Sequence, residues 1–283
     1  MVSNPRGYES AVFPEKVSYN LHMGSIENPP LIITPLYGIP DIQPDNSLAN
    51  VMLDTIAKQD IQLETNDILV IAQKVVSKAE NRFFNYADLE VSPYARELAN
   101  LCEKDPQFVE LVLSESRSVI RVTKGLLIVE HNSGFISANA GIDRSNIGKR
   151  DAPNEKWALL IPENADASAD KMRKQIFAST GKNIGILIID SHGRPWRNGT
   201  VGISIGFAGL PALIDMRGKC DLYGRVLEAT VICAVDELAA GASLVMGQAD
   251  ESIPVVHVRG FPYALEDGHF RDLLRTKDSD LFR

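Results

Sequence analysis

Apolar residues in this chain form short blocks of strand length, separated by stretches with helical periodicity. The blocks predict strands at 31–36, 68–72, 120–129, 134–140, 184–189, 228–235 and 254–258. The blocks 68–72 and 184–189 are apolar throughout, as is typical of strands buried on both faces. A turn at 131–134 joins two of the other blocks, so we expect a hairpin there.

Helices are predicted where a capping residue precedes an apolar face. Ser92 and Asp105 each stand before a proline, which suits an N-cap followed by the first helical position. Ser168 is predicted to cap a helix that runs through Phe177 and is closed by Gly181. We therefore expect helices that begin at Asn46 or Ser47 and at Ser168, and others at 93–103, 106–116 and 237–246.

Strand and helix patterns are interleaved, but the connections are irregular and several neighbouring strands read as hairpins. This arrangement predicts an α+β fold with a mixed β-sheet and flanking helices, and not a doubly wound parallel sheet. Residues 1–30 are polar, contain four prolines and show neither period, so we interpret them as an N-terminal extension.

Composition restricts the classes of function. The chain is 45% hydrophobic, which is ample for a core, and its net charge of −8 argues against general nucleic-acid binding. No apolar stretch reaches the roughly 20 residues that a membrane-spanning helix needs, and residues 1–19 lack the apolar block of a secretory signal. Three widely spaced cysteines fit neither a disulfide framework nor a paired zinc site. We expect a cytoplasmic protein with reduced thiols and no membrane or nucleic-acid partner.

Polar residues gather at four places where a predicted strand or helix ends. Residues 73–80 follow the strand 68–72 with two lysines, a hydroxyl and an amide, which suit phosphate oxygens but also suit a charged helix start. Residues 139–146 place Asp143 beside glycine and asparagine, as in a turn or a metal site. Residues 246–254 offer oxygen ligands, or form a helix end with solvent-facing acids.

The fourth place is the segment 190–199, where Asp190 ends an apolar block and Ser191 follows it. A carboxylate and a hydroxyl at a strand end can hold Mg²⁺ beside nucleotide phosphates, whereas the plain alternative is a solvated turn. Arg194 and Arg197 add cations suited to carboxylates or phosphates. His192 is interpreted as a hydrogen-bonded loop residue. No phosphate-loop, GxGxxG, GxSxG or HExxH motif occurs.

Five segments in order make the chain similar to the F420-0:γ-glutamyl ligase family from about residue 31 to 260. They are QKVVSKAE (73–80), NAGIDRSN (139–146), DSHGRPWRNGTVG (190–202), DLYGR (221–225) and MGQADE (246–251). The resemblance implies an α+β fold and an intertwined homodimer. It also implies a GTP-dependent ligase that uses two divalent ions, Mg²⁺ or Mn²⁺, with K⁺ as a further candidate ion.

The implied reaction joins L-glutamate to the lactyl carboxylate of F420-0 through an acyl phosphate, and then adds further γ-linked glutamates. The resemblance implies metal ligands at Asp143, Asp190, Ser191 and Gln248, although threonine is common in the family at the position of Ser191. It implies nucleotide contacts at Gly38, Ile39, Pro40, Asp41, Gln73, Lys74, Lys78, Asn146, Gly247, Gln248, Ala249, Asp250, Glu251, Ser252, Ile253 and Pro254. Gln73 and Lys74 replace small hydroxyl residues of some members. Lys78, Arg194 and Arg197 are expected to hold the anionic substrates during catalysis.

The match implies a catalytic domain over residues 31–262, which can be divided into 31–85 and 180–262 with an insert at 86–179. Residues 263–283 form a C-terminal tail outside the match. Two other functions stay open: a related amide ligase that acts on a different carboxylate, and a nucleotide-binding module without catalysis. The glycines at 202, 206 and 209 form a small-residue series that could let backbones approach closely, and a glycine-rich core contact explains it equally well.

Overall fold

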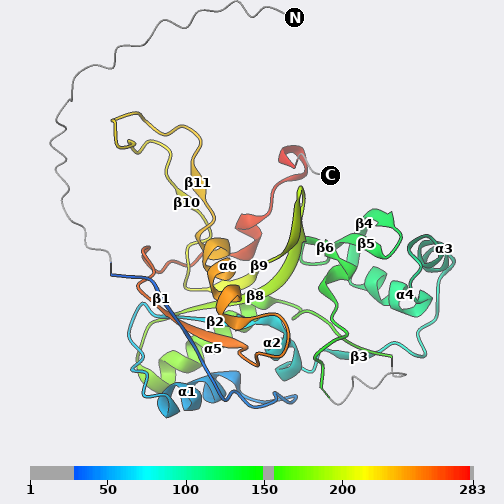
Figure 1. Ribbon diagram of the computed structural model, residues 1–283, viewed down its shortest axis with the longest axis horizontal. Helices are drawn as coiled ribbons and strands as arrows, with labels where there is room; N and C mark the ends of the chain where they lie inside the picture. Colours follow the sequence, from blue (N-terminus) through cyan, green and yellow to red (C-terminus); the bar gives the residue numbers. More distant parts are fainter. Residues whose placement is uncertain (1–28, 149–155, 281–283) are drawn as a thin grey trace, which may run out of the picture.

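The computed structural model describes residues 29–148 and 156–280 and has a five-stranded sheet at its centre (Figure 1). The strand order is β1-β12-β2-β8-β9, in which β2 and β8 are parallel and the other neighbours are antiparallel. The strands are β1 (Ile32–Pro35), β2 (Ile68–Ala72), β8 (Gly185–Arg194), β9 (Arg197–Ala208) and β12 (Val255–Arg259). The mixed sheet confirms the predicted α+β class.

Helices cover both faces of this sheet. In Figure 1, α1 and α5 lie below the sheet and α6 lies on the opposite side. The short helix α2 follows β2 without a linker. The bounds of these helices are α1 (Leu48–Lys58), α2 (Gln73–Ala79), α5 (Ala165–Thr180) and α6 (Ala234–Met246). The main hydrophobic core lies between these helices and the sheet, and β2 is almost entirely buried in it.

Two glycines of β9 allow these helices to approach closely. A Cβ at Gly206 would stand 2.3 Å from the Cβ of Ala165 on α5, and one at Gly202 would stand 2.6 Å from the carbonyl oxygen of Ala239 on α6. The register between β8 and β9 shifts between Ile188 and Ile189, and this bulge turns the two glycines toward opposite faces. The close-approach interpretation of the glycines is confirmed for both positions.

Residues 83–148 and 156–160 contain a second unit with its own core, at the right of Figure 1. A buried cluster around Phe108 and Leu127 fills it. Its elements are β3 (Phe83–Asn85), α3 (Pro93–Cys102), α4 (Pro106–Ser114), β4 (Ser116–Thr123), β5 (Leu126–His131), β6 (Ile136–Ala138), η1 (Asn139–Gly141) and β7 (Trp157–Leu159). The expected insert extended to residue 179, but α5 packs on the main core.

A narrow two-stranded arm projects from the main sheet (Figure 1). It consists of β10 (Ile214–Asp215) and β11 (Val231–Ile232) and the segment between them. Leu222 and Tyr223 near its tip are more than four-fifths exposed. The chain then continues through α6 and β12 to two single-turn helices, η2 (Phe270–Leu273) and η3 (Lys277–Ser279). Phe270 lies in the main core although it belongs to the expected tail.

Several local predictions are confirmed because the signal is contained in a few neighbouring residues. Ser47, Ser92 and Asp105 accept hydrogen bonds from the first turns of α1, α3 and α4, and Gly181 ends α5 at a φ of 68°. Within the described residues no helix has the length and apolarity needed to cross a membrane. The expected extension at 1–30 lies outside the described residues except for its last two positions.

Four predictions of element bounds are wrong. The strand at 120–129 is two strands, because Gly125 at a φ of 76° turns the chain between β4 and β5. The strand at 228–235 is reduced to β11, since α6 already begins at Ala234. The cap of α5 is Asn164, not Ser168, whose hydroxyl donates to Glu80. β8 does not end at Asp190 but continues into a hairpin with β9.

Candidate functional site

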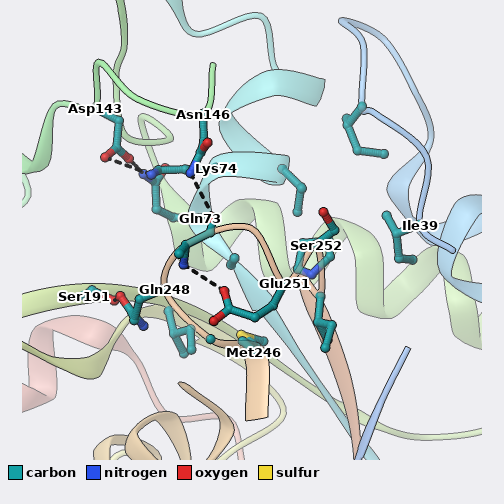
Figure 2. Close-up of a pocket in the computed structure, with 18 of the residues that line it drawn as sticks. Ile39, Gln73, Lys74, Asp143, Asn146, Ser191, Met246, Gln248, Glu251 and Ser252 are labelled. Carbon is teal, nitrogen blue, oxygen red and sulfur yellow. Dashed lines mark hydrogen bonds and ion pairs between the residues drawn. The ribbon is translucent and has the colours of Figure 1, made fainter. Parts of the chain in front are cut away.

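A cavity of about 720 Å³ opens where β2 ends beside the middle of β8 (Figure 2). Because these two strands are parallel and Ala72 pairs with Ile189, the residues that follow β2 lie beside Asp190 and Ser191 of β8. The segment 39–42, α2, the segment 143–148 and the loop 246–254 close the remaining sides. The cavity thus brings together the four polar segments singled out in the sequence. Every predicted metal ligand lines it, as does every predicted nucleotide contact except Gly38.

Asp143 is held by two side chains of α2. Gln73 donates from Nε2 to Oδ2 of Asp143 at 2.5 Å, and Nζ of Lys74 lies 3.2 Å from Oδ1 (Figure 2). Gln73 is itself buried and is fixed by Ser77, whose hydroxyl donates to Oε1 of Gln73 at 2.8 Å. The backbone of Asp143 forms a two-way bridge with Leu159, which anchors it to the second unit. The carboxylate therefore has a defined orientation.

Asp190 provides a second carboxylate in the same cavity. Nε2 of His192 lies 2.9 Å from Oδ2 of Asp190, and the imidazole is buried. Burial raises the pKa of Asp143 to about 6, and the negative charge of Asp190 adds to this effect, while Lys74 and Gln73 lower it in part. The two carboxylates are thus close enough to repel each other.

Ser191 of β8 and Gln248 of the loop after α6 contact each other at the wall of the cavity. The hydroxyl of Ser191 donates to Oε1 of Gln248 at 2.7 Å, and Nε2 of Gln248 donates to the hydroxyl of Ser243 at 2.9 Å. Two neutral oxygen donors therefore line the same cavity as the two carboxylates, and Figure 2 shows Ser191 and Gln248 side by side.

The loop 246–254 is shaped by contacts with its own backbone and with Asn146. Glu251 accepts from the backbone N–H of Ala249 at 2.8 Å, and these hydrogen bonds hold the pKa of the Glu251 carboxyl below its usual range. Gly247 has a φ of 75°, and a Cβ there would stand 2.1 Å from the carboxyl carbon of Glu251. Nδ2 of Asn146 donates to the carbonyl oxygen of Ala249 at 3.3 Å. The loop and the segment after Asp143 thus form one wall.

A cationic side chain lies on the opposite wall. Nζ of Lys78 is 3.1 Å from Oδ1 of Asp41, and the Lys78 side chain is only 11% exposed. Asp41 is more exposed and is also held by Nε2 of Gln43. α2 turns Lys78 into the cavity and not toward solvent.

The donors of the cavity suit a hard divalent cation. Among the described residues no cluster of three or more His, Cys, Asp or Glu side chains is arranged to hold a metal, so a closed zinc-type site is not formed there. Two carboxylates, a hydroxyl and an amide oxygen match the preference of Mg²⁺ or Mn²⁺ for oxygen ligands. Such ions complete their coordination shells with water and substrate phosphates. The raised pKa of Asp143 supports the fit, since a cation would relieve the repulsion between the carboxylates.

Three predicted site residues lie elsewhere. Gly38 belongs to the turn after β1, and Arg194 and Arg197 pair at the exposed end of the β8–β9 hairpin, where Arg194 donates to the carbonyl oxygen of Gly199. They do not line the cavity of the described chain.

The cavity also contains residues to which the sequence assigned no role. Thr200 comes from β9 and Ser243 from α6, and the others are Ile42, Ala72, Val75, Gly148, Ile189 and Met246. Thr200 lies within the segment 190–202, but only the pairing of β9 with β8 brings it to the cavity. Ser243 is five positions before Gln248, which is not a same-face helical spacing, so its contact with Gln248 also depends on the tertiary fold.

Comparison with known proteins places the chain among ligases. The model of a family described as F420-0:Gamma-glutamyl ligase matches residues 38–260. The coenzyme F420:L-glutamate ligase of Methanothermobacter thermautotrophicus is 40% identical over 87% of this chain and 96% of its own length. The proteins of the same name from Methanocaldococcus jannaschii and Archaeoglobus fulgidus are 44% and 38% identical, over 78% and 89% of this chain and 86% and 96% of their own lengths.

Proposed function

The chain belongs to the F420-0:γ-glutamyl ligase family, and from this premise we propose that it joins L-glutamate to the lactyl carboxylate of coenzyme F420-0 with GTP as the energy source. The observation that carries the proposal is the cavity itself. It combines two carboxylates, neutral oxygen donors and two lysines where β2 ends beside β8. These are the residue types needed to hold a metal-bound triphosphate beside a carboxylate substrate.

A carboxylate must be activated before an amine can replace one of its oxygens. In the proposed reaction, a carboxylate oxygen attacks the γ-phosphorus of GTP, and GDP leaves. The amine of glutamate then attacks the carbonyl carbon of the acyl phosphate, phosphate leaves and the amine loses a proton. Repetition at the γ-carboxylate of the added glutamate extends the product. No protein nucleophile is needed, in agreement with a cavity lined by acids, amides and lysines.

The residues of the cavity have separate proposed roles. Asp143 and Asp190 hold the divalent ions, and Ser191 and Gln248 complete the oxygen set, with K⁺ as a further candidate ion. The ions reduce the charge repulsion between the carboxylate and the γ-phosphate when bound. Lys74 and Lys78 would contact phosphate oxygens from α2. Both ammonium groups lie within 3.2 Å of a carboxylate, and a nucleotide phosphate can take the place of that carboxylate as the partner of the lysine.

Arg194 and Arg197 fit a different position in this proposal. They stand on an exposed hairpin beyond the cavity, so we assign them to the outer part of a bound acceptor and not to the reacting atoms. Their guanidinium groups suit the phosphate and carboxylates of an extended anionic acceptor.

We also propose that the protein is a homodimer in which the arm β10–β11 lies against a second copy. A two-stranded hairpin has little stability in water by itself, and this arm is not covered by any third strand of the described chain. Leu222, Val226 and Val231 expose large apolar side chains along it. A second copy would bury them.

The decisive experiment incubates the purified protein with F420-0, glutamate, Mn²⁺ and either GTP or ATP, and follows product masses. We expect products heavier by one and then more glutamate residues, with GTP. Added chelator should stop the reaction while circular dichroism shows an intact fold, since oxygen-bound Mg²⁺ or Mn²⁺ is seldom structural. A product in which glutamate is joined to a different carboxylate would identify an acceptor other than F420-0. Nucleotide binding without any product would indicate a binding module.

A further inference from the structure

His192 lies directly behind Asp190 on β8. The two residues are two positions apart in a strand, so their side chains leave the same face. Nε2 of His192 is 2.9 Å from Oδ2 of Asp190, and the histidine is only 6% exposed. Asp190 lines the cavity but His192 does not. The carboxylate therefore faces the cavity, and the imidazole holds it from the protein side.

The second ring nitrogen determines how this contact works. Nδ1 of His192 is buried and has no hydrogen-bond partner within the described chain. A hydrogen on Nδ1 would therefore be a buried donor without an acceptor, and it would leave a bare Nε2 facing a carboxylate oxygen. The favoured arrangement has the hydrogen on Nε2, where it is donated to Oδ2 of Asp190. Oδ1 of Asp190 is then the oxygen available to a cation.

Aromatic rings from two other parts of the chain hold the imidazole in place. The ring of Phe135, in the β5–β6 turn, lies 5.2 Å from the imidazole of His192, and it stacks on His131 at 4.6 Å. Phe270 of η2 meets the same Phe135 edge-on at 6.2 Å. The C-terminal segment, red in Figure 1, lies beside β9 and follows residue 260, where the family match ends. A segment outside the match thus supports the site.

We propose that His192 is a positioning residue that fixes one oxygen of Asp190 and presents the other to a divalent cation, with Phe135 and Phe270 as its aromatic support. This inference rests on the proposed metal-dependent function. A histidine that ligated the cation itself would have to bring a nitrogen to the cavity, whereas Nε2 is used by Asp190 and Nδ1 is buried. Hydrogen bonds behind a metal ligand commonly change metal affinity by about 10- to 100-fold.

The test measures the affinity for Mn²⁺ alone, from the electron paramagnetic resonance signal of the free ion. His192→Gln can donate from nearly the place of Nε2, whereas His192→Asn places its amide near Nδ1 and does not reach Asp190. We expect the Asn variant to bind Mn²⁺ about 10- to 100-fold more weakly and the Gln variant to stay near wild type. His192→Phe keeps the ring against Phe135 without the donor, and should resemble the Asn variant.

His257→Asn is the matched control. His257 is equally buried, and its Nε2 lies 2.8 Å from a carboxylate oxygen of Asp67 at the other end of the sheet. Its loss should lower the unfolding temperature but leave Mn²⁺ affinity unchanged. Equal affinity in wild type and in both the Asn and Phe variants of His192 would overturn the positioning role while leaving the proposed function intact. A wild-type protein that binds no Mn²⁺ would instead refute the metal site, and the inference with it.

Discussion

Asp143 is a residue at which catalysis and stability are expected to oppose each other. Its pKa is raised from 3.8 to about 6, first by burial and then by the charge of Asp190. The folded chain therefore retains a proton that the unfolded chain has lost between about pH 4 and 6. The free energy of unfolding consequently falls as the pH rises through this window, and it stays level above it.

Asp143→Asn should stabilise the metal-free protein above this window. The variant cannot ionise, so its free energy of unfolding at about pH 7.5 should exceed that of wild type by up to about 3 kcal/mol, and the difference should vanish near about pH 4. Urea unfolding at both pH values in chelator measures it, with the exposed Asp54→Asn as control. If the variant is less stable than wild type at the higher pH, the contacts of Lys74 and Gln73 stabilise the Asp143 carboxylate by more than its burial costs.

Lys78 allows a test of the phosphate-binding wall. Its side chain is 11% exposed and faces the cavity, so Lys78→Met should lose one charge-assisted hydrogen bond to the nucleotide. We expect GTP affinity to fall about 10- to 150-fold in a calorimetric titration, whereas the KM for glutamate should change far less. Lys182→Met, on an exposed loop, is the control. An unchanged dissociation constant for GTP would remove α2 from the nucleotide site.

At the scale of elements, two helices approach β9 closely at glycines. α5 begins where Gly206 leaves no room for a side chain, and α6, which carries Ser243 and leads into the loop with Gln248, crosses β9 at Gly202. The contact at Gly202 fixes a helix that borders the cavity, whereas the contact at Gly206 holds α5 on the main core. A methyl group at either glycine would displace a backbone, not a flexible side chain.

Gly206→Ala should therefore destabilise the protein by at least about 1–3 kcal/mol, measured by urea unfolding. Gly193→Ala on the adjacent strand is the matched control, because a Cβ there meets nothing within 4 Å. It should change the free energy of unfolding by no more than about 0.5 kcal/mol. If the two substitutions change the free energy of unfolding equally, α5 is not tightly packed against Gly206.

At the scale of the whole molecule, the arm is a part of the described chain that packs into neither hydrophobic core. Its strands contribute to neither core, and Leu222 at its tip is 87% exposed. Under the proposed homodimer, Leu222 lies in an interface, and a charge there would have to be buried.

Light scattering during gel filtration should accordingly give wild type a mass of twice the 31.1 kDa chain. The double substitution Leu222→Asp and Tyr223→Asp should shift this mass to that of one chain without loss of the fold. Leu101→Asp, on α3 at the far side of the molecule in Figure 1, introduces a similar charge at an exposed leucine and should leave the mass unchanged. A wild-type protein of single-chain mass would refute the dimer.

Sequence by itself determined the features that depend on neighbouring residues. Caps such as Ser92 with Pro93, and apolar blocks such as 68–72, act over one turn or one strand, so their structures were predictable. The four polar segments were also recognisable, because each follows an apolar block or a helical pattern in the sequence.

Tertiary structure alone decided which distant residues meet. The parallel pairing of β2 with β8 brings Gln73 and Asp190 to one cavity, and the bulge in β9 turns Gly202 and Gly206 to opposite faces. The support of His192 by Phe270 joins residues far apart in sequence through Phe135. Such contacts arise from strand pairing and core packing between remote segments, and no local pattern of side chains encodes which segments will become neighbours.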